Sequence, residues 1–104
     1  MNRLAFASLG LVLFSLTASA QGQQVYEAQK CSLCHSVAGK GNAKGPLDGV
    51  GSKYSVADLK LWITSPADMA KKHNATRKPP MKSYASLSAA DVDALVAFLQ
   101  TLKK

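Results

Sequence analysis

One short motif, Cys31-Ser32-Leu33-Cys34-His35, constrains this chain more than any other segment. Its C-x-x-C-H spacing is the attachment sequence of a c-type haem. Two thiols three positions apart fall on one side of a helical turn, so both can add to the vinyl groups of one porphyrin and form thioethers. The histidine that follows can reach the iron from the same side. The motif therefore predicts a covalent haem c held by Cys31 and Cys34, with His35 as an iron ligand.

Two other uses of the cysteine pair compete with haem attachment. A redox disulfide of the thioredoxin type belongs in a βαβ context, which this sequence does not show. A structural zinc site needs four nitrogen or sulfur ligands at finger-like spacings. Beyond the motif the sequence holds one further histidine, His73, and no further cysteine. The sequence therefore offers few ligands for a zinc site, and a disulfide is the main alternative to haem attachment.

The first twenty residues have the composition of a secretory leader. Arg3 gives a positive start, residues 4–16 are largely apolar, and Ala18-Ser19-Ala20 matches an A-x-A cleavage signal. The apolar run is shorter than the ~20 residues that a spanning helix needs. We therefore expect residues 1–20 to be a cleaved signal peptide and residues 21–104 to form one domain in the periplasm, without a transmembrane span.

The mature sequence indicates helices joined by loops, with no convincing strand. Good helix formers without Gly or Pro predict a first helix over residues 24–34. Residues 39–51 hold five glycines and Pro46, which predicts a loop suited to wrapping a flat ligand. A capping box that begins at Ser55 predicts a second helix that ends at Pro66.

The second half of the chain continues this helical pattern. Residues 68–73 could add a turn of helix, whereas Pro79 and Pro80 exclude a helix interior between 76 and 84. Ser88 is the expected N-cap of a final helix, whose apolar residues recur at helical spacing. This apolar stripe should bury against the first helix.

These features together resemble small class I bacterial cytochromes c over residues 21–104. The haem motif, the Gly45-Pro46 pair, the Lys78-Pro79-Pro80-Met81 stretch and the amphipathic last helix follow one another in the family's order. The resemblance implies an all-α fold of three to five helices wrapped around one haem, with the first and last helices crossing. It also implies a methionine from a late loop as the second iron ligand.

Met81 is the best match to that ligand, with Met69 and His73 as rivals. Met81 follows two prolines in a loop, whereas Met69 lies in a more helical context. Methionine usually fills gaps in a core, and a histidine beside Lys71 and Lys72 is usually a surface residue. A thioether favours ferrous iron, so His/Met ligation would raise the reduction potential above that of two histidines.

The resemblance also implies two contacts around the haem. A proline carbonyl after the motif accepts a hydrogen bond from the proximal histidine in this family, and Pro46 matches that position. An indole often binds a haem propionate, and Trp62 could do so through its single N–H. Alternatively, Pro46 is a simple turn residue, and Trp62 faces the core of its helix beside Leu59 and Ile63.

The chain is basic, which bears on its partners. The net charge is +7, and removal of residues 1–20 takes away Arg3 and no acidic residue, which leaves +6. Basic residues gather around the expected ligand loop: Lys71, Lys72, Arg77, Lys78 and Lys82. Around an exposed haem edge they would steer an acidic redox protein into contact. A generally basic, solvated surface is the alternative, and the sequence shows no nucleic-acid recognition motif.

The predicted function is that of a one-electron carrier rather than an enzyme. Two protein ligands would close the iron, and such a monomeric carrier would shuttle electrons between respiratory or dehydrogenase partners. One alternative is a haem subunit dedicated to one dehydrogenase. The other is a haem with an open iron site that acts as a peroxidase or gas sensor.

A mature chain of 84 residues is short for an independent core, because small domains bury a small fraction of their surface. We therefore predict that the protein without haem is largely unfolded. Circular dichroism of the Cys31→Ala, Cys34→Ala double variant should show little helix and no cooperative melting. A spectrum like that of the haem protein, with a cooperative transition, would contradict this prediction.

Overall fold

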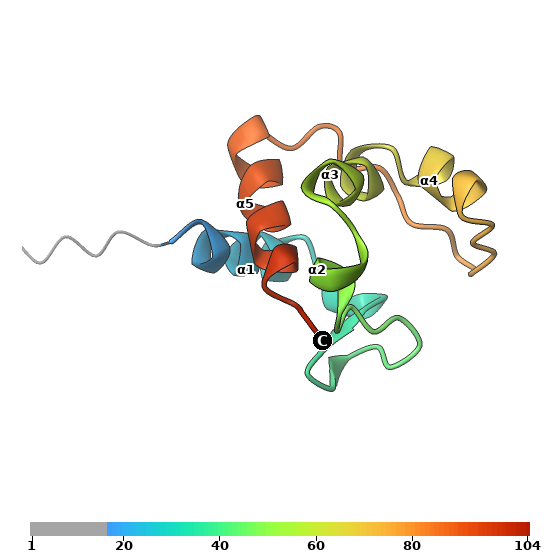
Figure 1. Cartoon of the computed structure of the whole chain (residues 1–104), viewed down its shortest axis with the longest axis horizontal. Helices are drawn as coiled ribbons and strands as arrows, with labels where there is room; N and C mark the ends of the chain where they lie inside the picture. The colour runs from blue at the N-terminus through green and yellow to red at the C-terminus, as the bar shows by residue number, and fades with distance from the viewer. Residues whose placement is uncertain (1–16) are drawn as a thin grey trace, which may run out of the picture.

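The computed structural model describes residues 17–104, in which α-helices are joined by loops and one short hairpin (Figure 1). The elements in chain order are α1 (Ala18–Ala28), a 3-10 turn (Cys31–Leu33), β1 (Ser36–Val37), β2 (Lys40–Gly41), α2 (Val50–Lys53), α3 (Val56–Thr64), α4 (Pro66–Lys72) and α5 (Ala89–Gln100). The predicted all-α fold is confirmed. Within this range no helix is both long and apolar enough to cross a membrane.

Most of the predicted signal peptide lies outside the described residues. Residues 1–16 are not described, and the first three residues of α1 belong to the predicted leader. The side-chain oxygen of Thr17 accepts a hydrogen bond from the backbone N–H of Ala20 (3.3 Å), which caps the start of α1. The proposed cleavage after Ala20 would therefore leave the mature chain to start inside this helix.

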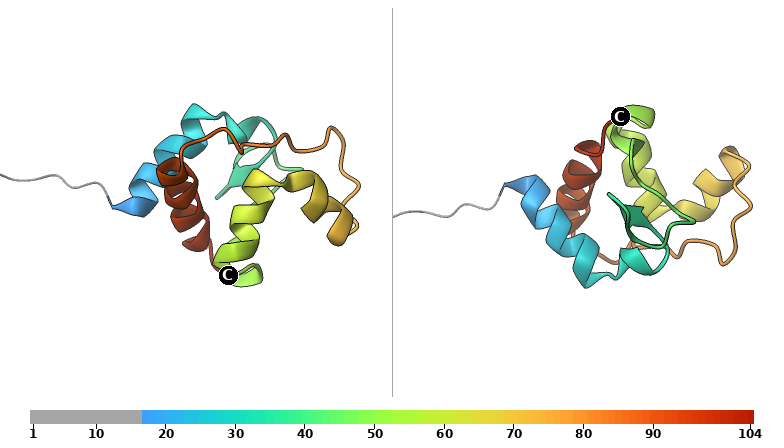
Figure 2. Two further views of the ribbon diagram at one scale, coloured as in Figure 1. Left: turned by 90° about the horizontal axis from the view of Figure 1, so that it is seen from above. Right: turned by 90° about the horizontal axis from the view of Figure 1, so that it is seen from below.

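The first and last helices cross and make the main contact of the fold (Figures 1 and 2). The rings of Tyr26 on α1 and Phe98 on α5 lie 5.5 Å apart between centroids. One turn earlier on α1, Gly22 lies so close to α5 that a Cβ atom there would overlap the carbonyl oxygen of Ala94. The predicted packing of the last helix on the first is therefore correct, and a glycine permits its closeness.

Helix α3 completes the core from the other side of α5. Helix α3 begins at the predicted cap, where the hydroxyl of Ser55 accepts a hydrogen bond from the N–H of Asp58 (3.2 Å). Leu59 and Ile63 point from α3 into the core. The buried core residues are Tyr26, Leu59, Ile63, Val92, Leu95, Val96, Phe98 and Leu99. Their spacing places one apolar stripe on each helix.

The first helix is shorter than predicted at its C-terminal end. Residues 24–34 do not form one helix, because α1 ends at Ala28 and Lys30 adopts a left-handed conformation (φ 56°). The motif residues Cys31–Leu33 then form a separate 3-10 turn. Helix propensity does not register such a single left-handed residue, so the break was not visible in the sequence.

The prediction of no strand is wrong at one place. Ser36–Val37 and Lys40–Gly41 pair antiparallel directly after the haem motif. Ala38 (φ 51°) and Gly39 (φ 80°) both have positive φ, as in the tight turns that favour two-residue hairpins. The strands are two residues long, so they leave no alternating pattern to detect.

A long connection follows α4 and returns past α3 to α5 (Figure 1). Residues 75–84 contain no helix, as the two prolines predicted. Two hydrogen bonds tie its end to α3: the N–H of Tyr84 to the carbonyl of Ile63 (2.9 Å) and the hydroxyl of Ser83 to the carbonyl of Thr64 (2.9 Å). These two bonds fix the end of the connection to α3.

The cap of α5 provides a test of this fold. The hydroxyl of Ser88 accepts a hydrogen bond from the N–H of Asp91 (3.1 Å). We predict that Ser88→Ala lowers the free energy of unfolding of the haem-loaded protein by about 1 kcal/mol, because a buried helix loses its N-cap. Ser86→Ala, at an exposed position in the preceding turn, is the matched control and should change stability little. Equal losses in urea unfolding of the two variants would contradict the assignment.

Candidate haem site

The haem motif forms one tight turn that gathers its three functional side chains. The carbonyl oxygen of Cys31 accepts hydrogen bonds from the N–H groups of Cys34 (3.1 Å) and His35 (2.9 Å). Cys31 is half-buried and Cys34 is exposed, and they are not joined in a disulfide. Burial raises the pKa of the Cys31 thiol, so this group stays protonated near neutral pH. Two free thiols in one turn match the requirement for two thioether bonds to a porphyrin.

His35 is oriented by a backbone carbonyl, but not by the predicted one. Its Nδ1 lies 3.0 Å from the carbonyl oxygen of Gly45, whereas Pro46 was expected to supply this acceptor. The same oxygen also accepts a hydrogen bond from the backbone N–H of Ser36 (3.0 Å). The acceptor of the His35 hydrogen bond is therefore one residue earlier in the loop than the predicted Pro46. A Cβ at Gly45 would overlap the Cys34 carbonyl oxygen and the Arg77 guanidinium, so the approach requires glycine.

This hydrogen bond decides which nitrogen of His35 is free. A carbonyl can only accept, so Nδ1 carries the proton and Nε2 keeps its lone pair. Burial is the main cause of the lowered pKa of His35, and the positive charge of Arg77 lowers this pKa further. The hydrogen bond to Gly45 acts in the opposite direction and raises it. The ring is therefore neutral near pH 7, with Nε2 available as a metal ligand.

The motif turn forms one side of a large cleft. Two adjoining cavities, of about 750 and 630 Å³, share lining residues and so form one cleft. The shared residues are Cys31, His35, Trp62, Ala75, Arg77 and Met81. Each volume lies within the range of about 300–1,000 Å³ found for cofactor sites. The walls are mostly apolar, as a flat hydrophobic macrocycle requires.

Of the three candidates for the second iron ligand, Met81 is the one that lines the cleft. It contributes to both cavities and is 37% exposed. Met69 lies on α4, is 3% exposed and lines neither cavity, so it fills a buried position. His73 lines neither cavity and stacks on the ring of Trp62. The placement supports Met81 as the predicted ligand opposite His35.

Two polar atoms in the cleft wall fit a bound group with acceptors. Within residues 17–104 the indole Nε1 of Trp62 and the hydroxyl of Tyr26 are buried without a hydrogen-bond partner. Both residues line the cleft. Buried donors without partners are costly, so each indicates a missing acceptor. A haem propionate fits the role predicted for Trp62, and Trp62 faces the cleft while Leu59 and Ile63 fill the core.

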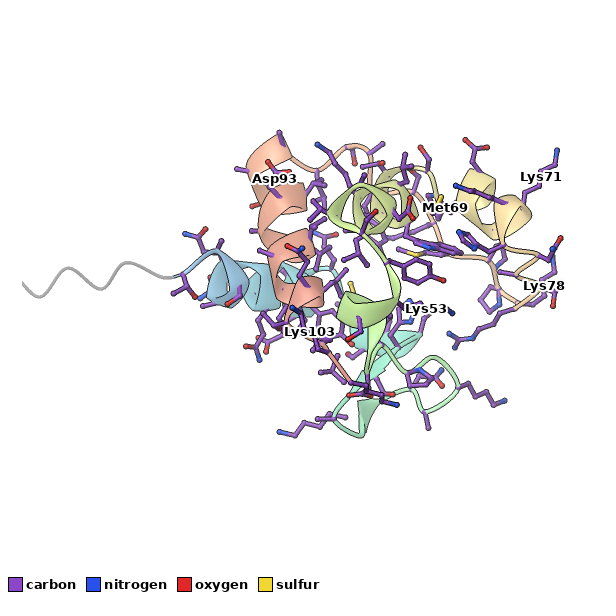
Figure 3. All side chains as sticks on the ribbon, viewed as in Figure 1. Lys53, Met69, Lys71, Lys78, Asp93 and Lys103 are labelled. Carbon is purple, nitrogen blue, oxygen red and sulfur yellow. The ribbon has the colours of Figure 1, made fainter. Side chains whose placement is uncertain are left out.

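Cations surround one mouth of this cleft. The lining of the larger cavity includes Lys30, Lys71, Arg77, Lys78 and Lys82, and among the described residues no acidic side chain joins them. Lys71 and Lys78 lie at the end of the molecule away from Lys103 (Figure 3). Lys72, predicted with this cluster, is exposed beside it and does not line the cleft. We call these five lining cations the basic rim.

Sequence reasoning missed several residues of the site. Gly45 was counted as a loop glycine, although its carbonyl orients His35. Tyr26 lies in the segment that was predicted only to form the first helix, although its hydroxyl is also buried at the cleft. Lys30 joins the rim through its left-handed turn. No local signal marked these roles, because each depends on segments that are distant in sequence.

Comparisons with known proteins agree with this geometry. A family model described as Cytochrome c matches residues 19–103. A cytochrome c oxidase subunit 2 from Alkalihalophilus pseudofirmus is 34% identical over 96 residues, which cover 84% of this chain and 26% of that protein. The chain thus spans about a quarter of the length of this relative. No solved structure matches the chain significantly.

The two methionines allow a direct test of the iron ligand. We predict that Met81→Ala removes the weak band near the red end of the ferric spectrum, which reports sulfur ligation. Met69→Ala, the matched control, should keep this band and instead lose stability by about 2–5 kcal/mol, because Met69 is buried. Absorption spectra and urea unfolding of both haem proteins provide the measurements. Loss of the band in Met69→Ala alone would assign the ligand to Met69.

Proposed function

The chain belongs to the cytochrome c family, and on this premise we propose that it is a one-electron carrier with His35 and Met81 as the two axial ligands. Members of this family bind a covalent c-type haem with iron. The iron supplies a reversible ferric/ferrous couple. In this chain Cys31 and Cys34 would hold the porphyrin, Trp62 would donate its N–H to a propionate, and Gly45 would orient His35.

One observation carries the proposal: a neutral imidazole and a thioether line the same cleft, from the motif turn and from the late loop. With both as ligands, the iron has no ready site for oxygen, peroxide or substrate. Such an iron also changes charge with little movement of its ligands, which suits electron transfer. The same arrangement speaks against a peroxidase or gas sensor, which needs an open position.

The proposed location is the periplasm. The apolar stretch of residues 4–16 and the Ala18-Ser19-Ala20 sequence support export and cleavage, which would leave residues 21–104 as the working domain. The test is to recover the haem protein from the periplasmic fraction and to determine whether Gln21 is its amino terminus.

We further propose that the basic rim docks redox partners with acidic surfaces. The rim cations line the same cavity as Leu33, which lies between the two cysteines and is 70% exposed. An apolar centre with a charged rim is a common composition for a transient interface. The likeness to an oxidase subunit makes a terminal oxidase a candidate acceptor. A dedicated haem subunit of one dehydrogenase is the second candidate.

Optical spectroscopy tests the proposed carrier. The purified haem protein should cycle between ferric and ferrous forms, show the sulfur band when ferric, and fail to bind carbon monoxide rapidly when ferrous. Rapid carbon monoxide binding would instead establish an open iron site. Size-exclusion chromatography of native extract would separate a free monomer from a subunit of a larger complex.

Charge reversal tests the basic rim. We predict that Lys82→Glu slows oxidation of the ferrous protein by hexacyanoferrate(III), a small anion, roughly three- to tenfold at low salt, because a rim cation becomes an anion. Lys103→Glu makes the same change in net charge away from the rim and is the matched control (Figure 3). The difference should shrink at high salt. Stopped-flow rates that fall equally in the two variants would show that net charge, rather than the position of the rim, controls the rate of oxidation.

A further inference from the structure

His73 is an exposed residue in an aromatic cluster beside the cleft. Its ring stacks on the indole of Trp62, with 5.6 Å between centroids and 26° between planes. Tyr54 meets both rings edge-on, at 5.6 Å from His73 and 6.0 Å from Trp62. The backbone N–H of His73 donates to the carbonyl of Met69 (3.0 Å), which fixes it at the end of α4. The indole is therefore held between two rings.

The same indole also lines the cleft. Its Nε1 is buried and has no partner within the described residues, and Trp62 lines both cavities. Trp62 thus contacts the ring of His73 and also lines the cleft, whereas His73 itself lines neither cavity and is exposed to solvent. Histidine is also the residue whose charge ordinarily changes between pH 5 and 8.

We propose that His73 is a positioning residue that holds the indole of Trp62 against the cleft and makes the ferric/ferrous equilibrium depend on the proton of its imidazole. This proposal rests on the proposed haem function. It accounts for a histidine that is neither a ligand nor part of the core. It also identifies the Tyr54, Trp62 and His73 cluster as a link between solvent pH and the cleft.

The sign of the effect follows from the charges. Ferric haem carries one positive charge more than ferrous haem, so a protonated His73 favours the ferrous form. As the pH rises the imidazole loses its proton, and the midpoint potential should fall. By linkage, reduction of the iron should make His73 bind its proton more tightly.

Other ionisable groups near His73 bear on this effect as well. On the neighbouring segments they are Lys53 in α2, Tyr54 directly after it, Asp58 and Lys60 on α3, and Asp68, Lys71 and Lys72 on α4. Ordinary carboxyl, phenol and ammonium groups do not titrate between pH 5 and 8. The sequence holds two histidines, and His35 would be bound to iron. The amino terminus and the propionates are the remaining competitors.

Two substitutions separate charge from position. His73→Phe keeps a ring that can stack on Trp62 but carries no proton, and His73→Gln removes both the ring and the charge. The midpoint potential of the haem proteins is measured by optical titration from pH 5 to 8. In the unmodified protein we expect the ferric/ferrous equilibrium constant to change roughly two- to fivefold, as for two unit charges that interact through a partly screening medium. Both variants should lose this dependence.

The position of the indole has its own readout. Trp62 is the single tryptophan of the chain, so the near-ultraviolet circular dichroism of tryptophan reports its environment. His73→Phe should largely keep this signal and His73→Gln should reduce it.

A reversible protein whose potential does not change with pH would overturn the proposal. The same holds for a pH dependence that persists in His73→Phe, which would assign it to the amino terminus or a propionate. Loss of the sulfur band in His73→Phe would also overturn it, because His73 would then affect ligation itself. Failure of the proposed function looks different, since the unmodified protein would then bind carbon monoxide or lack a reversible couple.

Discussion

The carbonyl oxygen of Cys31 sets the geometry on which the site depends. By accepting from the N–H groups of Cys34 and His35, it closes a turn that directs two sulfurs and an imidazole to one side. The left-handed Lys30 separates this turn from α1, so the motif can face the cleft while the helix packs on α5. The Gly45 carbonyl then fixes the imidazole ring. Two backbone acceptors thus organise one whole wall.

The opposite wall is held much more lightly. The core lies where α1, α3 and α5 meet, to one side of the cleft. The connection that carries Met81 is tied to this core near Tyr84 and Ser83, by two hydrogen bonds to the end of α3. A bond from Met81 to iron would join the two walls. The haem would thereby complete both the core and the loop of a chain too short to bury much surface alone.

Positive charge affects this site in two ways. The basic rim would attract an anionic partner to the cleft mouth. In the proposed haem protein the same charges, together with a protonated His73, would disfavour the extra positive charge of ferric iron. A thioether ligand would act in the same direction, because it favours ferrous iron. Docking and reduction potential would then be coupled, so changes to the rim should alter both.

The sequence alone determined those features that depend on neighbours along the chain. The spacing of Cys31, Cys34 and His35 specifies haem attachment, Ser55 and Ser88 cap their helices, and Pro79 and Pro80 keep the ligand loop open, because each acts over a few residues. Helical periodicity likewise gave the all-α class.

Only the tertiary structure decided which distant groups meet. It placed the Gly45 carbonyl rather than that of Pro46 against His35, and Met81 rather than Met69 or His73 in the cleft. It also turned Trp62 toward the cleft and stacked His73 behind it. These choices follow from loop register and helix crossing, which a local pattern does not contain, because they depend on contacts between segments far apart in the sequence.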